Sequence, residues 1–152
     1  MDDVVKMIES DPKSAKTGPD FLMHRVLDHL VDEKYEAFDN MEDDLEEAEE
    51  SLISDVERFQ PRRLIDLRKI LLTLRKGLYH EREILVKICR SDCPFISEKA
   101  IIHFRDVYDH LAKFFELTET YREIETSLME LYSSLLSNQM NRMSNETNSS
   151  IK

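Results

Sequence analysis

The chain has 152 residues, of which 21 are Lys or Arg and 32 are Asp or Glu, so its formal net charge is -11. It contains only 2 Gly and no Trp, and 41% of its residues are hydrophobic. β-Sandwiches, barrels and phosphate-binding α/β domains need glycines in their turns, so we expect an all-α protein. The hydrophobic fraction is sufficient for a core, which argues against global disorder.

The net charge and the cysteine content indicate the cellular compartment and the kinds of partner to expect. A strongly acidic chain disfavours nucleic acid, because phosphate binding requires a basic surface. Cys89 and Cys93 are the only cysteines, too few for a disulfide scaffold, and they indicate a reducing cytosol. No signal peptide is present, and no apolar run reaches the about 20 residues of a membrane span. We therefore expect a cytoplasmic chain that crosses no membrane and binds cations or basic proteins.

The first long helix follows a weak N-terminal element. Residues 1–19 contain a short apolar pattern and the Gly18-Pro19 breaker, which indicate one or two helical turns and a loop. With Asp20 as its N-cap, a helix can extend to about Glu57. Its later apolar positions are spaced by 3 and 4 residues, the seam of a coiled coil, and are Phe38, Met41, Leu45, Ala48 and Leu52.

A second helix follows Pro61 with a matching seam. Its apolar positions are Leu64, Leu67, Leu71, Leu74, Leu78, Leu85 and Ile88. Residues 28–57 contain 14 acidic residues and one Lys, whereas residues 61–90 contain 9 basic and 3 acidic residues. Two matching seams of opposite charge, joined by a short turn, predict an antiparallel helical hairpin.

The third helix is too long for a compact domain of this size. The segment from Ser91 to Pro94 breaks the second helix, and Ser97 can cap a helix that extends to about Met143, roughly 70 Å at 1.5 Å per residue. An apolar stripe with nothing in the same chain to cover its far end predicts self-association. Its members are Val107, Leu111, Phe114, Leu117, Tyr121, Ile124, Leu128, Leu131 and Leu135. We expect three parts: 1–19, the three-helix module 20–143, and a disordered polar tail, 144–152.

The third helix resembles the stalk helix of CorA-type magnesium/cobalt transporters. The segments RDVYDH (105–110) and LYSSLLSNQMN (131–141) carry most of the similarity, which covers roughly residues 12–143. The resemblance implies a helical hairpin and stalk from the cytosolic part of a homopentameric channel embedded in the inner or plasma membrane. The family's α/β layer, its membrane helices and its Gly-Met-Asn signature have no counterpart here. An expressed fragment, a split or degenerate gene product and a stand-alone soluble relative all fit such a module.

Asp106 and Asp109 are the first candidate metal ligands. With His110 they occupy positions i, i+3 and i+4, so they share one helix face. Such a face can present oxygens to Mg²⁺, often through water. The alternative is an exposed polar face, or pairing of both carboxylates with Arg or Lys of the hairpin. The family resemblance implies that a carboxylate at Asp106 belongs to a regulatory cation site between protomers.

Glu130 and Asn141 are the other two candidates. Glu130 is 24 residues beyond Asp106, about 36 Å along a helix, so the two cannot share one ion. The resemblance implies a second inter-protomer site at Glu130, half-built here because its partner acid lies in the missing α/β layer. It also implies that Asn141 corresponds to a polar residue at the inner end of the pore. A polar stripe at spacings 4, 3 and 4 fits a wet axial channel or simply a solvated face. It consists of Glu130, Ser134, Ser137 and Asn141.

The other polar clusters lack the residue patterns of known metal or catalytic sites. The acidic run 41–50 lacks the glycine and alternating oxygens of an EF-hand, and a solvated face explains it. His24 and the acids near it lack the paired Glu-x-x-His repeats of a di-iron bundle. Cys89 and Cys93 lack the further ligands of a zinc site. No nucleophile has a nearby His with an orienting acid in the sequence, so we expect no enzyme activity.

Two functions follow. The first is a CorA-like module that couples divalent-cation binding, with a weak Mg²⁺ response, to gating in an intact homologue and does not transport alone. The second is a soluble helical adaptor that uses its apolar stripe to bind itself or another protein and has no transport role.

Overall fold

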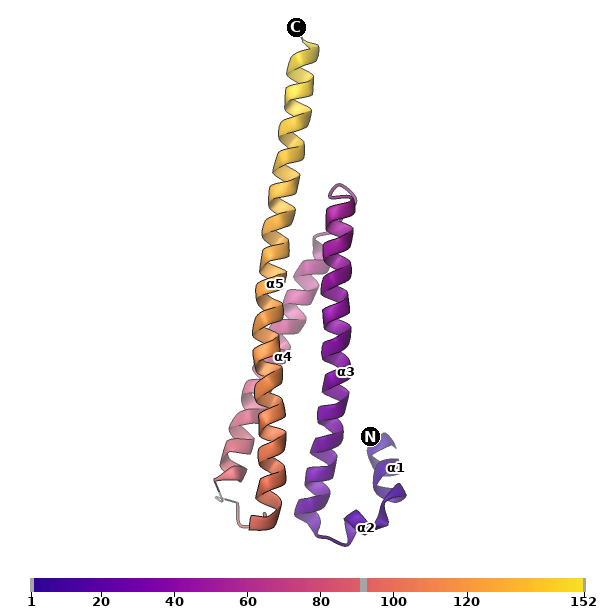
Figure 1. The fold of residues 1–152 in the computed structure, drawn as a ribbon, viewed down its shortest axis with the longest axis vertical. Coiled ribbons are helices and arrows are strands. Elements are labelled where there is room, and N and C mark those ends of the chain that lie inside the picture. The colour runs from indigo at the N-terminus through magenta and orange to yellow at the C-terminus, as the bar shows by residue number, and fades with distance from the viewer. Residues whose placement is uncertain (1, 91–92, 152) are drawn as a thin grey trace. The chain divides into compact units, whose positions relative to one another are not determined.

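The computed structural model describes residues 2–90 and 93–151. These residues form helices and no strand, so the all-α prediction is confirmed (Figure 1). The helices are α1 (Asp2–Ser10), α2 (Pro12–Ala15), α3 (Pro19–Ser54), α4 (Arg62–Cys89) and α5 (Glu98–Ser150). Ser91 and Asp92, expected within the break after the second long helix, lie outside the described residues, as does Lys152 of the expected tail.

The chain divides into two compact units, and each long helix contributes a segment to both. Unit 1 comprises Met1–Asp39 and Arg75–Leu117, and unit 2 comprises Asn40–Leu74 and Thr118–Lys152. This division differs from the boundaries expected near residues 19 and 143. A sequence reveals boundaries through breakers and linkers, whereas these units are defined by packing along uninterrupted helices.

Within each unit the acidic helix α3 pairs with the basic helix α4, as the predicted hairpin requires. In unit 1, Lys34 Nζ lies 3.3 Å from Glu81 Oε1. In unit 2, Arg63 Nη2 donates a 2.6 Å hydrogen bond to Glu47 Oε2. This hydrogen bond and the charge of Arg63 hold the pKa of the Glu47 carboxyl below its ordinary value. Opposite charges on the two helices therefore favour the pairing.

The predicted seams of α3 and α4 supply the core. All five seam positions of α3 are buried, and so are the seam positions of α4 except the half-buried Leu74. Helix α5 adds large buried side chains, among them Phe104 and Phe114. Burying apolar surface stabilises a fold by roughly 25 cal/mol per Å², so these seams provide most of the stabilisation within each unit.

The core face of α5 in unit 2 differs from the predicted stripe. The side chain of Ile124 is 39% exposed, whereas that of its neighbour Glu125 is only 1% exposed. The buried positions Thr118, Tyr121, Glu125 and Leu128 follow the spacing 3, 4, 3. The predicted stripe is therefore covered in part, because Tyr121 and Leu128 are buried whereas Ile124 is exposed. Helical periodicity places Glu125, and not its neighbour Ile124, on the side that faces inward.

Helices α3 and α5 begin side by side in unit 1. Gly18 has a φ of 132° and its carbonyl accepts a 3.1 Å hydrogen bond from the N–H of Leu22, so Gly18, not Asp20, caps α3. Pro19 suits the first helical position because its φ is already fixed. Asp20 Oδ1 accepts a 2.9 Å hydrogen bond from the N–H of Phe21, and Asp20 Oδ2 accepts hydrogen bonds from the N–H and hydroxyl of Ser97, at 3.0 and 2.6 Å. The Ser97 hydroxyl accepts the N–H of Ala100, which confirms Ser97 as the α5 cap.

We expect Asp20→Asn to lower the urea midpoint of unfolding at pH 7. The Ser97 hydrogen bonds hold the pKa of Asp20 below its ordinary value. A lowered pKa stabilises the fold above the unfolded-state pKa of about 4, and this contribution is lost as the pH falls through the folded-state value. The midpoint difference between the native chain and Asp20→Asn should therefore narrow between pH 7 and pH 3. Asp39→Asn, at an exposed position, is the control, and an equal effect there would contradict the prediction.

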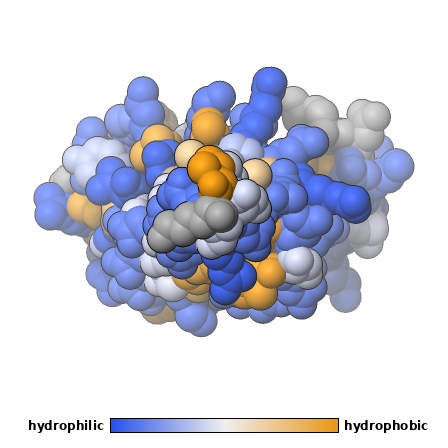
Figure 2. Space-filling model, turned by 90° about the horizontal axis from the view of Figure 1, so that it is seen from above, coloured by the Kyte–Doolittle hydropathy of each residue, from blue (hydrophilic) through white to orange (hydrophobic). Residues whose placement is uncertain are grey.

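The C-terminal end differs from the expected polar tail, because α5 continues to Ser150. Hydroxyls there donate to carbonyls four residues earlier: Thr147 to Met143 at 2.9 Å, and Ser149 to Asn145 at 2.9 Å. All described residues from Asn141 onward are exposed. Burial therefore does not stabilise this last part of α5, and hydrophilic side chains cover most of the surface seen from above (Figure 2).

Candidate functional site

Asp106 and Asp109 lie on the exposed surface of α5 in unit 1. They line a surface hollow together with His110, Lys113 and Glu116. Within the described residues neither aspartate carboxylate forms an ion pair with this chain. Pairing with Arg or Lys of the hairpin, the alternative considered from the sequence, is therefore not what the structure contains. Both carboxylates remain available to a ligand from solvent.

A hydrogen bond and an aromatic cluster fix this face of α5 against α3. The hydroxyl of Tyr35 lies 2.8 Å from His110 Nδ1. The Tyr35 ring also packs edge-on against Phe114, with centroids 4.7 Å apart, and Phe38 stacks on Phe114 at 4.9 Å. His110 shares the helix face of the two aspartates. Its contact with Tyr35 therefore fixes the orientation of this face of α5 relative to α3.

His24 of α3 lies close enough to Asp106 for that carboxylate to affect its pKa. Its ring centroid is 5.0 Å from that of His103. Burial, the largest effect, holds the pKa of His24 below its ordinary value, and the charges of Asp28 and Asp106 oppose this shift. His24 therefore favours its neutral form and adds little positive charge beside Asp106.

Asp109 also borders a second hollow, on the α4 side of α5. This hollow is lined by Val86, Cys89, Arg90, Arg105, Tyr108 and Asp109. Burial raises the pKa of the Cys89 thiol, Asp109 reinforces the shift, and Arg105 opposes it. Cys89 is consequently a protonated, half-buried thiol, and both cysteines are free.

Glu130 and Asn141 lie on the part of α5 that belongs to unit 2, and both are exposed. Ser134 and Ser137, between them on the polar stripe, are exposed as well. Glu130 forms no ion pair within the described residues. The stripe is thus a continuous polar face directed to solvent. This is compatible with both interpretations of the sequence, a helix that lines a water-filled channel and a helix with a solvated face.

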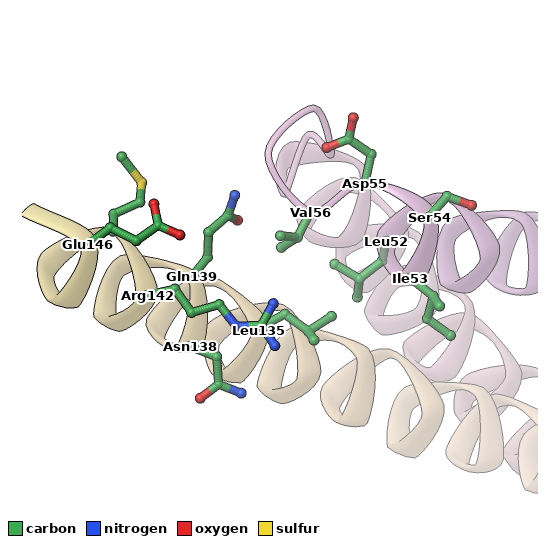
Figure 3. Close-up of a pocket in the computed structure, with 11 residues that line it drawn as sticks. Leu52, Ile53, Ser54, Asp55, Val56, Leu135, Asn138, Gln139, Arg142 and Glu146 are labelled. Carbon is green, nitrogen blue, oxygen red and sulfur yellow. The ribbon is translucent and has the colours of Figure 1, made fainter. Parts of the chain in front are cut away.

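A pocket lies beside this stripe, between the end of α3 and the last third of α5 (Figure 3). The α3 side contributes Leu52 to Val56, and the α5 side contributes Leu135, Gln139 and Arg142 among others. The Gln139 amide donates to the carboxylate of Glu57 in the turn after α3. Asn141 is not among the lining residues, so the pocket and the stripe are separate features.

The four candidate ligands do not form one metal centre. Asp106 and Asp109 belong to unit 1, and Glu130 and Asn141 belong to unit 2. Nowhere in residues 2–90 and 93–151 do three His, Cys, Asp or Glu side chains gather in a way that could hold an ion. Mg²⁺ often binds through one or two carboxylates and keeps several waters, so each group offers part of a coordination shell.

Sequence reasoning missed one buried ionic contact, between Arg68 of α4 and Glu125 of α5. Arg68 Nε donates a 2.9 Å hydrogen bond to Glu125 Oε2, while Glu125 Oε1 is buried with no hydrogen-bond partner in the described part of the chain. Following the 3, 4, 3 spacing from Thr118 along α5 would have placed Glu125 inside, and a basic partner on α4 would then have been required.

Comparisons with known proteins agree with this fold. Residues 1–146 match the family described as CorA-like Mg²⁺ transporter protein. The cobalt/magnesium transport protein CorA of Thermotoga maritima is 31% identical over 128 residues, which are 84% of this chain and 36% of that protein. The putative metal ion transporter YfjQ of Bacillus subtilis is 33% identical over 146 residues, 91% of this chain and 43% of that protein.

The complete structure of the CorA magnesium transporter from Methanocaldococcus jannaschii superposes with a TM-score of 0.82 at 26% identity. The match covers 96% of this chain and 48% of that chain. The soluble domain of the same transporter gives a TM-score of 0.77, covering 88% of this chain and 56% of that one. The chain therefore belongs to the CorA-like Mg²⁺ transporter family.

The chain spans about two fifths of the length of the curated relatives it matches, between 36% and 43%. Across the described helices, none is both long enough and apolar enough to cross a lipid bilayer.

Proposed function

We propose that this chain is the helical cytoplasmic module of a divalent-cation transporter, in which cation binding between copies is coupled to gating. The observation that carries the proposal is the pair Asp106 and Asp109: two exposed carboxylates on one face of α5, without an ion pair among the described residues. Membership of the CorA-like family supports Mg²⁺ as the ion. The chain alone does not transport.

The mechanism is electrostatic. A chain of net charge -11 repels its own copies, and carboxylates that face one another across an interface repel most strongly. A divalent ion between them offsets that repulsion and favours the assembled, closed arrangement. Loss of the ion lets the copies separate, so cation occupancy shifts the population between two states.

The coordination chemistry favours a weak response. With no group of three acidic, His or Cys ligands among the described residues, each copy offers only part of a shell. Mg²⁺ dehydrates reluctantly and would bridge the carboxylates partly through its waters. We expect a response at about millimolar Mg²⁺, the weak end of the range for oxygen-ligand cation sites.

Glu130 and Asn141 occupy a second position along α5 in this proposal. Glu130 would contribute one carboxylate to a site between copies, and the exposed polar stripe down to Asn141 would border a water-filled axis along which hydrated cations move. The exposure of the whole stripe supports this role. A polar lining exchanges hydrogen bonds with the hydration shell and does not strip it.

The test is sedimentation velocity of the native chain with and without Mg²⁺. We expect Mg²⁺ to increase self-association of the native chain, and the double variant Asp106→Asn/Asp109→Asn to lose most of that increase. Glu130→Gln should weaken the response less, because it removes one carboxylate and not two.

Glu36→Gln/Asp39→Asn is the matched control, because it removes two exposed charges of unit 1 from α3 and leaves the α5 face intact. It should keep the response to Mg²⁺. Identical mass and shape of the native chain and all variants, with and without Mg²⁺, would overturn the proposal and favour a helical adaptor.

A further inference from the structure

Helix α4 has an exposed basic and apolar face in unit 2, opposite its buried side. Ile65 and Leu72 are 42% and 46% exposed, although both are large hydrophobic residues. Arg62 and Lys69 are also exposed. The four residues follow one another along α4 at spacings of 3, 4 and 3, which places them on one face of the helix. The buried leucines Leu64, Leu67 and Leu71 occupy the other side of the helix. We call the four residues Arg62, Ile65, Lys69 and Leu72 the α4 outer face.

A groove of the opposite charge lies between α3 and α5 in the same unit. Its acidic residues are Glu42, Glu46 and Glu49 of α3 and Glu123 of α5. Its apolar residues include Leu45, Ile124 and Leu128. Within the described part of the chain, Glu46, Glu49 and Glu123 form no ion pair, and Glu42 makes only a 3.5 Å contact with the Tyr121 hydroxyl. The groove therefore combines carboxylates that form no ion pair among the described residues with an apolar floor.

The two surfaces match in charge and in spacing. Residues 40–54 contain seven acidic residues and no basic one, whereas residues 62–74 contain four basic residues and one acidic one. Glu42 and Glu49 are seven residues apart, about 10.5 Å along α3, and so are Arg62 and Lys69 along α4. Two cations on one helix can thus lie opposite two carboxylates on another while the apolar residues between them meet.

We propose that the α4 outer face of one copy of this chain docks into the α3–α5 groove of a second copy. Each copy carries both surfaces, so the contact is head-to-tail and leaves one free surface of each kind on a pair. Such a contact generates a ring when its rotation closes. Ile65 and Leu72 of one copy would cover Ile124 of the other, which removes exposed apolar surface on both sides.

Contacts within the chain do not prevent this docking. Arg62 and Lys69 both approach Asp66 of their own helix, at 3.8 and 3.6 Å. The side chain of Asp66 is 52% exposed, and such surface pairs contribute little, so they can be exchanged for carboxylates of another copy. Arg63 and Arg68, which the chain uses for its own packing, are not part of the outer face.

This interface deepens the proposed function, because cation bridging requires copies that assemble, but it needs no metal itself. It is therefore tested in the presence of EDTA, where bridging by cations is absent. Two full-length variants are made: Glu42→Lys/Glu49→Lys reverses the two groove carboxylates whose spacing matches the outer face, and Arg62→Glu/Lys69→Glu reverses the outer face. Circular dichroism establishes that each remains helical.

We expect each variant alone to self-associate at least about tenfold more weakly than the native chain in sedimentation velocity at low salt. An equimolar mixture of the two should regain association, because a reversed groove fits a reversed outer face and the native surfaces fit each other. Asp43→Lys/Glu50→Lys, which makes the same charge change at exposed α3 positions outside the groove, should self-associate as the native chain does.

Three results would overturn the interface: a native chain that is monomeric in EDTA, groove and control variants that associate equally well, or a mixture that does not regain association. A native chain that associates through these surfaces but ignores Mg²⁺ would instead overturn the cation-coupled function alone. A chain that responds to Mg²⁺ while the charge reversals have no effect would overturn only the interface.

Discussion

Replacing Phe114 with Ala should lower the free energy of unfolding by about 3–5 kcal/mol, the usual cost of removing a buried aromatic side chain. Phe114 is fully buried, and it stacks on Phe38 with the ring planes 19° apart. It also supports the Tyr35 ring, whose hydroxyl contacts His110. The expected measurement is urea unfolding followed by circular dichroism.

The neighbouring Phe115 is a matched control of the same residue type. It is half-buried, and the guanidinium groups of Arg75 and Arg82 lie 5.4 and 5.2 Å from its ring centroid. Phe115→Ala leaves a smaller cavity and loses cation–π contacts of about 0.5–1 kcal/mol each. An equal loss of stability from the two substitutions would show that the Phe114 cluster does not dominate unit 1.

Arg68→Met should lower the free energy of unfolding by about 2–3 kcal/mol, because it leaves the Glu125 carboxylate buried without its partner. Breaking a buried ion pair from one side costs about 3–5 kcal/mol. The lower value applies because the Arg68 side chain is 44% exposed, so water reaches part of the space it leaves. Urea unfolding of Arg68→Met against the native chain measures this loss.

Glu125→Leu should be neutral or stabilising by comparison. It places an apolar side chain at a buried position of α5 and removes a carboxylate oxygen that has no hydrogen-bond partner in the described structure. The double variant Arg68→Met/Glu125→Leu should therefore be more stable than Arg68→Met alone. A destabilisation by Glu125→Leu as large as that of Arg68→Met would refute the idea that the unpaired charge is what costs stability.

The candidate site was only partly accessible from the sequence. The spacing of Asp106, Asp109 and His110 shows that they share a helix face, because that follows from helical geometry alone. That His110 is held by Tyr35, 75 residues earlier in the chain, does not follow from any local pattern. The availability of the two carboxylates likewise depends on where the hairpin places its basic residues, which is a tertiary property.

What the sequence by itself determined is the helical class, the two hairpin seams and the opposite charges of the helices that form them. Scarce glycine and apolar positions at 3 and 4 residue spacing express local geometry, which every helix obeys wherever it packs. The tertiary structure decided that Glu125 is buried while Ile124 is exposed, that Asp20 contacts Ser97 of a distant segment, and that two units share three unbroken helices. These outcomes depend on which side chains of other helices each residue contacts. Local conformational preferences do not determine those contacts, because the contacts join residues that are far apart in the sequence.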